Sequence, residues 1–145
     1  MARVLLIGGS GFIGGHVAAR LAAEGHAIRV PTRRRTRARR LALLPAIDIV
    51  ESDIHDPASL DALMTGVDVV VNLVGVLHSP SGHPYGPAFA RAHVTLPERI
   101  LAAMEKAGVK RLVHMSALGA APDAPSEYLR SKAAGEEREI GRAHV

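Results

Sequence analysis

The stretch VLLIGGSGFIGGHVAARLAAEG, residues 4–25, decides the fold predicted for this chain of 145 residues. An apolar run of strand length, Val4–Ile7, leads into five glycines between Gly8 and Gly15, and an apolar pattern with helical spacing follows. Glycine inside a helix costs about 1 kcal/mol relative to alanine, so five glycines at a strand-to-helix junction need a reason. A sharp turn that brings the backbone close to another group supplies one.

Two glycine registers fit such a turn. Gly8, Gly11 and Gly14 form G-x-x-G-x-x-G, whereas Gly9, Gly11 and Gly14 form G-x-G-x-x-G. In either register Gly11 lets the backbone reach a pyrophosphate, and Gly14 lets the helix pack closely on the strand. The helix N-terminus then offers unpaired N–H groups and the positive end of its dipole to the phosphates. The alternative is a glycine-rich turn without a ligand.

The rest of the chain alternates between strand-like and helix-like segments with short connections. This alternation predicts an α/β fold, a doubly wound parallel sheet of the Rossmann type with strand order 3-2-1-4-5 and helices on both faces. Gly108 is predicted to close the longest helix. The predicted strands are residues 4–7, 27–32, 47–51, 67–72 and 112–116, and the predicted helices are residues 11–24, 37–44, 60–64, 89–107 and a last one from Ser126.

Composition excludes several classes of protein. Hydrophobic residues make up 48% of the chain, which favours a globular domain over a disordered one. No cysteine is present and the eight histidines lack metal-ligand spacing, so we predict neither disulfides nor a metal site. No run approaches the ~20 apolar residues of a membrane helix, and no secretory signal is recognisable, so we expect a cytoplasmic protein.

Basic charge is concentrated in one segment. Seven of the eighteen basic side chains are arginines within residues 29–40, which contain no acidic residue. Such a patch could attract nucleic acid or anionic lipid. No aromatic residues interleave with it and it matches no nucleic-acid-binding module, so we predict no nucleic-acid partner. A small ligand that carries phosphate is the simpler interpretation.

Arg33 and Arg34 follow the second predicted strand. The side chains at this position distinguish proteins that bind NAD(H) from those that bind NADP(H). An acidic residue there would bind the ribose 2′-hydroxyl of NAD(H). Guanidinium groups instead favour the 2′-phosphate, so NADP(H) is predicted over NAD(H). The alternative is a solvated arginine face, and this is the prediction for Arg37, Arg39 and Arg40.

Asp53 and Ile54 follow the third predicted strand. Asp53 could accept a hydrogen bond from the adenine amino group. A role in the turn that leads to Pro57 is an equally open interpretation.

A second group of polar residues lies in the last third of the chain. Tyr128 and Lys132 are four residues apart and share one face of the last predicted helix, while Ser116 ends the fifth predicted strand. An ammonium beside a phenol favours the phenolate, so Tyr128 is a candidate general acid/base. Ser116 could hydrogen-bond a substrate oxygen, and Lys132 could also hold the nicotinamide ribose. The alternative is a surface helix, because Y-x-x-x-K is frequent by chance.

These motifs resemble the short-chain dehydrogenase/reductase superfamily, in its extended or atypical NAD(P)-binding branch of NAD-dependent epimerase/dehydratase-like proteins. The segments that carry the resemblance are GGSGFIGG at 8–15, NLVGVLH at 72–78, GVKRLVHMSALGA at 108–120 and SEYLRSKAAGE at 126–136. More narrowly, the last three are similar to bacterial relatives of the NADPH-binding accessory subunit of respiratory complex I. The resemblance covers residues 2–139.

The resemblance implies a role for each matching position. The implied cofactor contacts are Gly8, Gly11, Phe12, Ile13 and Gly14 at the pyrophosphate, Arg33 at the 2′-phosphate, Asp53 and Ile54 at adenine, and Val74 and Gly75 along the cofactor. The implied catalytic set is Ser116, Tyr128 and Lys132. His93 departs from the pattern, because many extended members carry asparagine there. The C-terminal half that holds the substrate pocket in relatives has no counterpart in these 145 residues.

Three functions are compatible with these features. The first is an NADP(H)-preferring oxidoreductase or epimerase/dehydratase that acts on an unidentified small molecule; its first 145 residues alone are expected to be inactive. The alternative is a non-catalytic NADPH-binding accessory or assembly subunit of a respiratory or quinone-related complex, peripheral to the inner membrane. The third is a cofactor-sensing regulator.

The end of the sequence carries a separate expectation. Residues 1–139 are expected to form one NAD(P)-binding domain. Residues 140–145, IGRAHV, match the in-frame translation of a common sequencing adapter, so we expect this tail to be non-native and the natural protein to continue.

Overall fold

The computed structural model describes residues 1–143, so the end of the expected tail lies outside the described residues. The chain divides into two compact units. The first consists of Met1–Leu73 and Ala103–His114, and the second of Val74–Ala102 and the chain from Met115 onward. Each unit is described by itself.

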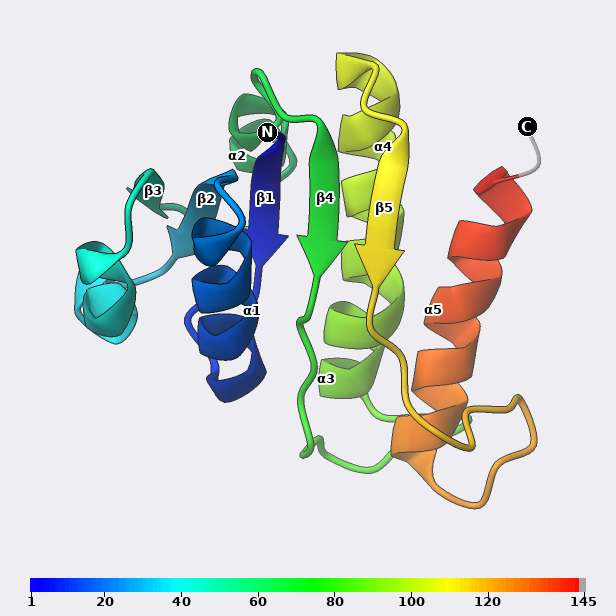
Figure 1. The fold of residues 1–145 in the computed structure, drawn as a ribbon. Helices are drawn as coiled ribbons and strands as arrows, with labels where there is room; N and C mark the ends of the chain where they lie inside the picture. Colours follow the sequence, from blue (N-terminus) through cyan, green and yellow to red (C-terminus); the bar gives the residue numbers. More distant parts are fainter. Residues whose placement is uncertain (144–145) are drawn as a thin grey trace. The chain divides into compact units, whose positions relative to one another are not determined.

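A parallel sheet of five strands forms the first unit (Figure 1). The strand order is β3-β2-β1-β4-β5, which confirms the predicted fold class and order. In the register, Leu5 lies opposite Arg29 on one side and Val70 on the other, and Asn72 lies opposite His114. The strands are β1 (Arg3–Ile7), β2 (Ala27–Thr32), β3 (Ile47–Glu51), β4 (Val69–Asn72) and β5 (Arg111–His114).

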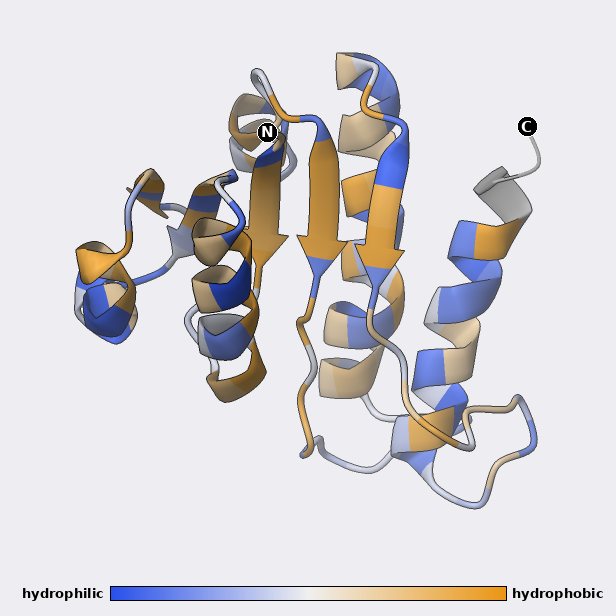
Figure 2. Ribbon diagram, in the orientation of Figure 1, coloured by the Kyte–Doolittle hydropathy of each residue, from blue (hydrophilic) through white to orange (hydrophobic). Residues whose placement is uncertain are grey.

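Burial on both faces of β1 explains its continuous apolar sequence. Val4 and Leu6 join a core cluster with Ile28 of β2 and Ala18 of α1 (Phe12–Ala23), while Leu5 is buried on the opposite face. Figure 1 shows α1 in front of the sheet and α2 (Pro57–Leu63) behind it. Figure 2 shows that β1 and β4 are hydrophobic along most of their length.

Two helices of this unit differ from their predicted form. The segment predicted as a helix over 37–44 is a 3-10 helix, η1 (Arg35–Leu43). Helix α2 begins at Pro57 rather than Leu60, because the Asp56 side chain accepts a hydrogen bond from the Ser59 N–H at 3.1 Å and proline suits the first helical position.

The predicted helix over 89–107 is interrupted. It begins at Pro87 as α3 (Pro87–Ala90), continues as a π-helical turn, η2 (Arg91–Thr95), and becomes α4 (Leu96–Ala107). In the second unit, a Cβ on Gly135 of α5 (Glu127–Ala143) would overlap the carbonyl oxygen of His93 in η2. This close backbone approach gives a physical reason for a glycine inside α5.

Strand β5 ends at His114, so the prediction that Ser116 ends the strand is wrong. The ladder with β4 stops where β4 stops, at the Asn72–His114 pair, and Ser116 lies two residues further along. No helix within residues 1–143 is long and apolar enough to cross a lipid bilayer.

Candidate functional site

The turn between β1 and α1 requires glycine at two positions. Gly8 has φ +86°, a conformation that side chains other than glycine's rarely adopt. A Cβ on Gly14 would overlap the Gly8 carbonyl oxygen and lie 2.5 Å from the Gly9 Cα. The helix therefore packs directly on the backbone of the turn, as the spacing of the glycines predicts.

Gly11 has a different environment. A Cβ on it would meet only the Gly8 carbonyl oxygen, at 3.4 Å, which is an ordinary contact distance. Gly11 is also the N-cap of α1 and makes no side-chain capping bond. The first N–H groups of α1 have no partner within the helix, and Gly11 leaves space because it has no side chain. This arrangement fits a phosphate group. Phe12 and Ile13 are 83% and 48% exposed beside it.

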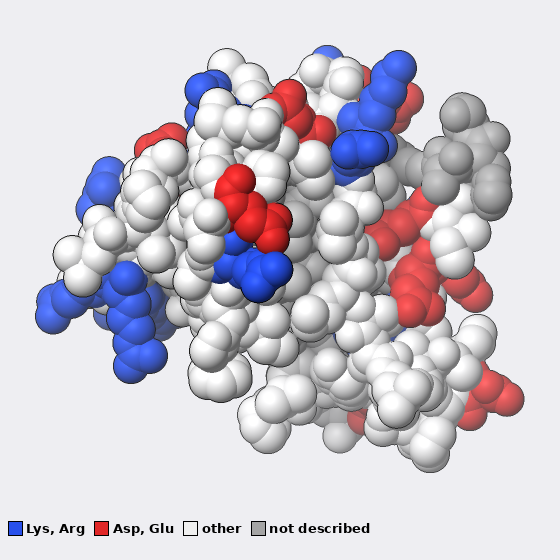
Figure 3. Space-filling model, viewed as in Figure 1, with Lys and Arg blue, Asp and Glu red and all other residues white. Residues whose placement is uncertain are grey.

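An open cavity of about 670 Å³ lies next to this turn in the first unit. Ser10, Gly11 and Phe12 line it from the turn, and Arg37, Arg39 and Arg40 line it from η1. These three arginines are exposed, as predicted for a solvated face, and they also border a cavity that includes the glycine turn. Figure 3 shows basic side chains gathered over η1.

Arg33 and Arg34 come directly after β2 and are both exposed, outside the lining of this cavity. Within residues 1–143, no ion pair or side-chain hydrogen bond is formed by either of them or by the three cavity arginines. Cationic groups without protein partners are available to an anionic ligand.

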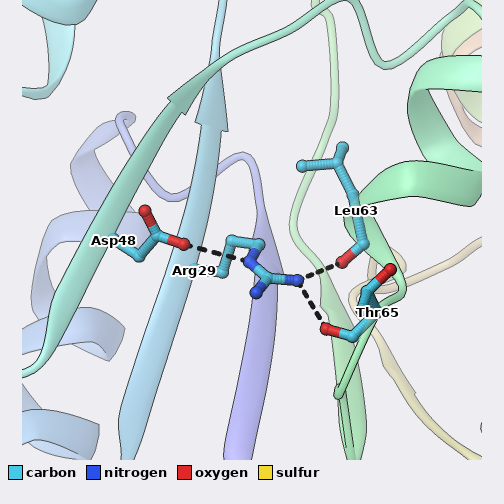
Figure 4. Close-up of polar contacts among 4 residues, drawn as sticks. All are labelled: Arg29, Asp48, Leu63 and Thr65. Atoms are coloured by element: carbon cyan, nitrogen blue, oxygen red, sulfur yellow. Dashed lines mark hydrogen bonds and ion pairs between the residues drawn. The ribbon is translucent and has the colours of Figure 1, made fainter.

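Arg29 differs from the other arginines of the cluster. Its Nε donates to Asp48 at 3.1 Å, and its Nη1 donates to the carbonyl oxygens of Leu63 at 2.7 Å and Thr65 at 2.8 Å (Figure 4). This side chain links β2 to β3 and to the turn after α2. Arg29 is therefore a structural residue rather than a part of the exposed basic patch.

Asp53 takes part in the turn that follows β3. The exposed Asp53 side chain accepts a hydrogen bond from the His55 N–H at 2.9 Å, and its carbonyl accepts one from the Asp56 N–H at 3.1 Å. These contacts are typical of a turn residue. The role of Asp53 and the half-buried Ile54 at adenine stays a prediction.

The residues of the predicted catalytic set lie in the second unit. Lys132 is buried, and its Nζ donates a hydrogen bond to the carbonyl oxygen of Met115 at 2.8 Å, which ties α5 to the residue before Ser116. The Ser116 Oγ is buried and has no hydrogen-bond partner among the described residues. The half-buried Tyr128 ring packs edge-on against Phe89 and His93. A buried hydroxyl without a partner, close to a buried ammonium, is a feature that ligand-binding sites share.

Burial lowers the pKa of Lys132 from its ordinary value of 10.5, and the negative charges of Glu139 and Glu136 oppose this shift. Desolvation disfavours the charged ammonium, whereas nearby carboxylates favour it, and the desolvation is larger. Lys132 therefore releases its proton more readily than a solvated lysine.

This shift predicts how stability depends on pH. Because the pKa of Lys132 is lower in the folded chain, the unfolded chain binds more protons between the lowered value and 10.5, and the free energy of unfolding rises with pH in that window. A Lys132→Met variant lacks this contribution, so its stability relative to the wild type should be highest near neutral pH and fall towards pH 10.5. Urea denaturation of both proteins across this range measures the difference, and a pH-independent difference would contradict the assignment.

Sequence reasoning assigned no contact to His93, although it marked this residue as a departure from the family pattern. His93 is 1% exposed and hydrogen-bonds both to the Val76 N–H and to Ser131 of α5. A Cβ on the predicted cofactor residue Gly75 would lie 3.7 Å from the His93 Nε2. The neighbouring Val74 is half-buried. No group of three or more metal-ligating side chains occurs in the described part of the chain.

Among known proteins, the chain is similar to subunits of NADH-ubiquinone oxidoreductase and of NADH dehydrogenase [ubiquinone]. The chain is 29% identical over 135 residues to the mitochondrial NADH-ubiquinone oxidoreductase 40 kDa subunit of Neurospora crassa, covering 91% of this chain and 35% of that protein. It is 33% identical over 137 residues to NADH dehydrogenase [ubiquinone] 1 alpha subcomplex subunit 9, mitochondrial, of Arabidopsis thaliana, covering 91% of this chain and 33% of that protein. The chain thus spans about one third of the length of these relatives.

A solved structure supports the fold. The Bordetella bronchiseptica enzyme WbmG, in complex with NAD, superposes with a TM-score of 0.75 at 24% identity, covering 97% of this chain and 49% of that one. The sequence profile of the NAD dependent epimerase/dehydratase family matches residues 4–139. The glycine turn and the parallel sheet are consistent with this match. The chain therefore belongs to the NAD dependent epimerase/dehydratase family.

Proposed function

We propose that this protein binds NADP(H) at the glycine turn and uses it in an oxidoreductase or epimerase/dehydratase reaction on a small molecule. The observation that carries the proposal is the open face of Gly11 beside a cavity bordered by arginines. Gly8, Gly11 and Gly14 with the first N–H groups of α1 would hold the pyrophosphate. Cationic side chains without protein partners would hold the 2′-phosphate.

Either of two groups of arginine side chains could bind the 2′-phosphate. Arg33 and Arg34 occupy the position after β2 where family members bind this part of the cofactor. Arg37 and Arg40 line the cavity that also contains Ser10 and Gly11. No acidic residue lies within residues 29–40 to repel a phosphate or to bind the 2′-hydroxyl. Both groups support NADP(H) over NAD(H).

The chemistry would be divided between the cofactor and this chain. A bound nicotinamide supplies a hydride donor or acceptor. The Tyr128 hydroxyl would transfer a proton to or from the reacting oxygen of the substrate. The Ser116 Oγ, which has no partner among the described residues, would donate a hydrogen bond to that oxygen. Lys132, which is buried on the same helix, would hold the nicotinamide ribose.

Calorimetric titration of the wild type with NADPH and with NADH tests the cofactor proposal. We expect the wild type to bind NADPH more tightly than NADH by about tenfold or more, because charge-assisted hydrogen bonds to phosphate contribute about 1.5–3 kcal/mol each. The double variants Arg33→Gln/Arg34→Gln and Arg37→Gln/Arg40→Gln should narrow that gap and leave NADH binding nearly unchanged.

Arg20→Gln is the matched control for these variants. Arg20 is an exposed arginine of α1 paired with Glu24 at 2.9 Å, outside the cavity lining, so its loss changes the net charge without touching the proposed site. Equal affinity of the wild type for NADPH and NADH would overturn the assignment of NADP(H).

The relatives favour a second candidate function, a non-catalytic dinucleotide-binding subunit of a respiratory complex. The supporting observation is that both relatives named above are subunits of NADH-oxidising respiratory enzymes. Tyr128→Phe separates the two functions, because it removes the only proposed proton-transfer atom and leaves the glycine turn intact. If the protein is an enzyme, this variant loses turnover but keeps NADPH binding; if it is an accessory subunit, its assembly and respiration are unchanged.

A further inference from the structure

His93 lies at the centre of a chain of hydrogen bonds in the second unit. The Val76 N–H donates to the His93 Nε2 at 3.0 Å, and the His93 Nδ1 lies 2.9 Å from the Ser131 Oγ. The Ser131 Oγ in turn donates to the carbonyl oxygen of Tyr128 at 2.7 Å. Both side chains are fully buried, with exposed fractions of 1% and 0%.

These contacts determine which ring nitrogen carries the proton. A backbone N–H is always a donor, so the Nε2 that faces Val76 must be an acceptor and carries no hydrogen. In a neutral imidazole the hydrogen is then on Nδ1, which donates to the Ser131 Oγ, and the serine hydroxyl is free to donate to Tyr128. All three bonds run in one direction, from the Val76 N–H to the Tyr128 carbonyl.

His93 is also closely packed through both its ring and its backbone. His93 lies within the π-helical turn η2, and such turns are frequent at functional sites. Its ring stacks on Phe89 with centroids 5.7 Å apart and meets the Tyr128 ring edge-on at 5.3 Å. Gly135 of α5 lies against its carbonyl oxygen, where a side chain would not fit. The ring of His93 therefore packs on Phe89 and Tyr128, while its carbonyl oxygen packs against α5.

We propose that His93 is a positioning residue, a neutral imidazole protonated on Nδ1, which fixes the main chain at Val76 relative to the main chain at Tyr128. The inference rests on the proposed function, because the proposed function assigns proton transfer to Tyr128 and cofactor contact to the segment that begins at Val74. His93 itself touches neither the reacting atoms nor a proton in transfer. It acts through Val76 on the segment predicted to line the cofactor, and through Ser131 on the residue proposed to transfer the proton.

Nitrogen NMR of the protein labelled with 15N-histidine tests the tautomer directly and needs no cofactor. We expect the His93 Nδ1 to have the chemical shift of a protonated nitrogen and the Nε2 that of an unprotonated acceptor near neutral pH. A proton on Nε2, or a doubly protonated ring, would overturn the inference. This measurement is made on the wild type, so it holds even if every variant fails to fold.

Three substitutions at position 93 then separate hydrogen bonding from packing. The Gln oxygen reaches about as far as Nε2 and can accept from Val76, whereas the Asn amide reaches only about as far as Nδ1. His93→Phe keeps a ring without either bond. We expect hydrogen exchange at the Val76 amide to be about tenfold faster or more in His93→Asn and His93→Phe, and close to the wild-type rate in His93→Gln.

Ser131→Ala completes the test, because it removes the link to Tyr128 and leaves the bond to Val76. It should leave exchange at Val76 unchanged and reduce turnover or NADPH affinity. Wild-type exchange at Val76 in His93→Phe would show a packing role alone and overturn the inference. Failure of the wild type to bind NADPH would instead contradict the proposed function, while the tautomer would still be measurable.

Discussion

A Gly11→Ala variant should fold normally and bind NADPH about tenfold to hundredfold more weakly than the wild type, a loss of about 1.4–2.7 kcal/mol. In the free chain an added Cβ meets only the Gly8 carbonyl oxygen at 3.4 Å, so the turn can accommodate it. In the complex the same Cβ would stand between the first turn of α1 and the pyrophosphate. Calorimetry measures the affinity, and urea denaturation measures the stability.

Gly15→Ala is the matched control for this change. Gly15 carries the same substitution four residues along the chain, and a Cβ there meets nothing within 4 Å. Gly15 also lines the cavity, so this variant is a control for stability only. Because alanine is the better helix former by about 1 kcal/mol, it should be slightly more stable than the wild type. NADPH binding by Gly11→Ala as tight as that of the wild type would mean that no ligand approaches the backbone at Gly11.

A Gly14→Ala variant should lose about 3 kcal/mol of unfolding free energy, the upper part of the range for overpacked cores. The added Cβ would overlap the Gly8 carbonyl oxygen and lie 2.5 Å from the Gly9 Cα. These are backbone atoms of the turn, and they can move only if α1 separates from β1. The higher helix propensity of alanine offsets about 1 kcal/mol of the cost at most.

Urea denaturation of Gly14→Ala beside Gly15→Ala isolates the steric effect. Both variants add one methyl group to the start of the same helix and differ only in what that group meets. If the two variants unfold at the same urea concentration, the close packing of α1 on the turn does not contribute to stability.

The sheet could be predicted because the sequence signals for its strands and turns lie in short contiguous segments. The apolar runs at β1 and β4 are continuous since both faces are buried, and the glycines after Ile7 mark the turn that starts the first crossover. When strands alternate with helices, the right-handed connections between parallel strands allow few strand orders. The strand order 3-2-1-4-5 was therefore predictable without any knowledge of contacts.

What could not be predicted depends on contacts between residues distant in sequence. Strand β5 ends at His114 because β4 ends at Asn72, so the position of Ser116 depends on a partner strand. The π-helical turn η2 forms where His93 bonds to Val76 and Ser131, on either side of it in the chain. Gly135, a glycine inside a helix, was the one local sign of that close approach.

The arginine cluster at residues 29–40 shows the same limit. Composition predicts a basic patch but cannot say which arginines have protein partners. Arg29 is bound by Asp48 and two carbonyl groups, whereas Arg37 and Arg40 border the cavity beside Gly11. These roles follow from the positions of β3 and α1 around the cluster, which the sequence pattern does not contain.

The central claim is that a dinucleotide binds with its pyrophosphate against the turn at Gly11. An NMR titration of the 15N-labelled protein with NADPH tests it most directly, through the backbone amides of Gly11, Phe12 and Ile13. The account predicts that these amides shift saturably and together, with an affinity tighter than about 1 mM. Amides at the turn that stay unshifted at that NADPH concentration, or shifts confined to other parts of the chain, would contradict it.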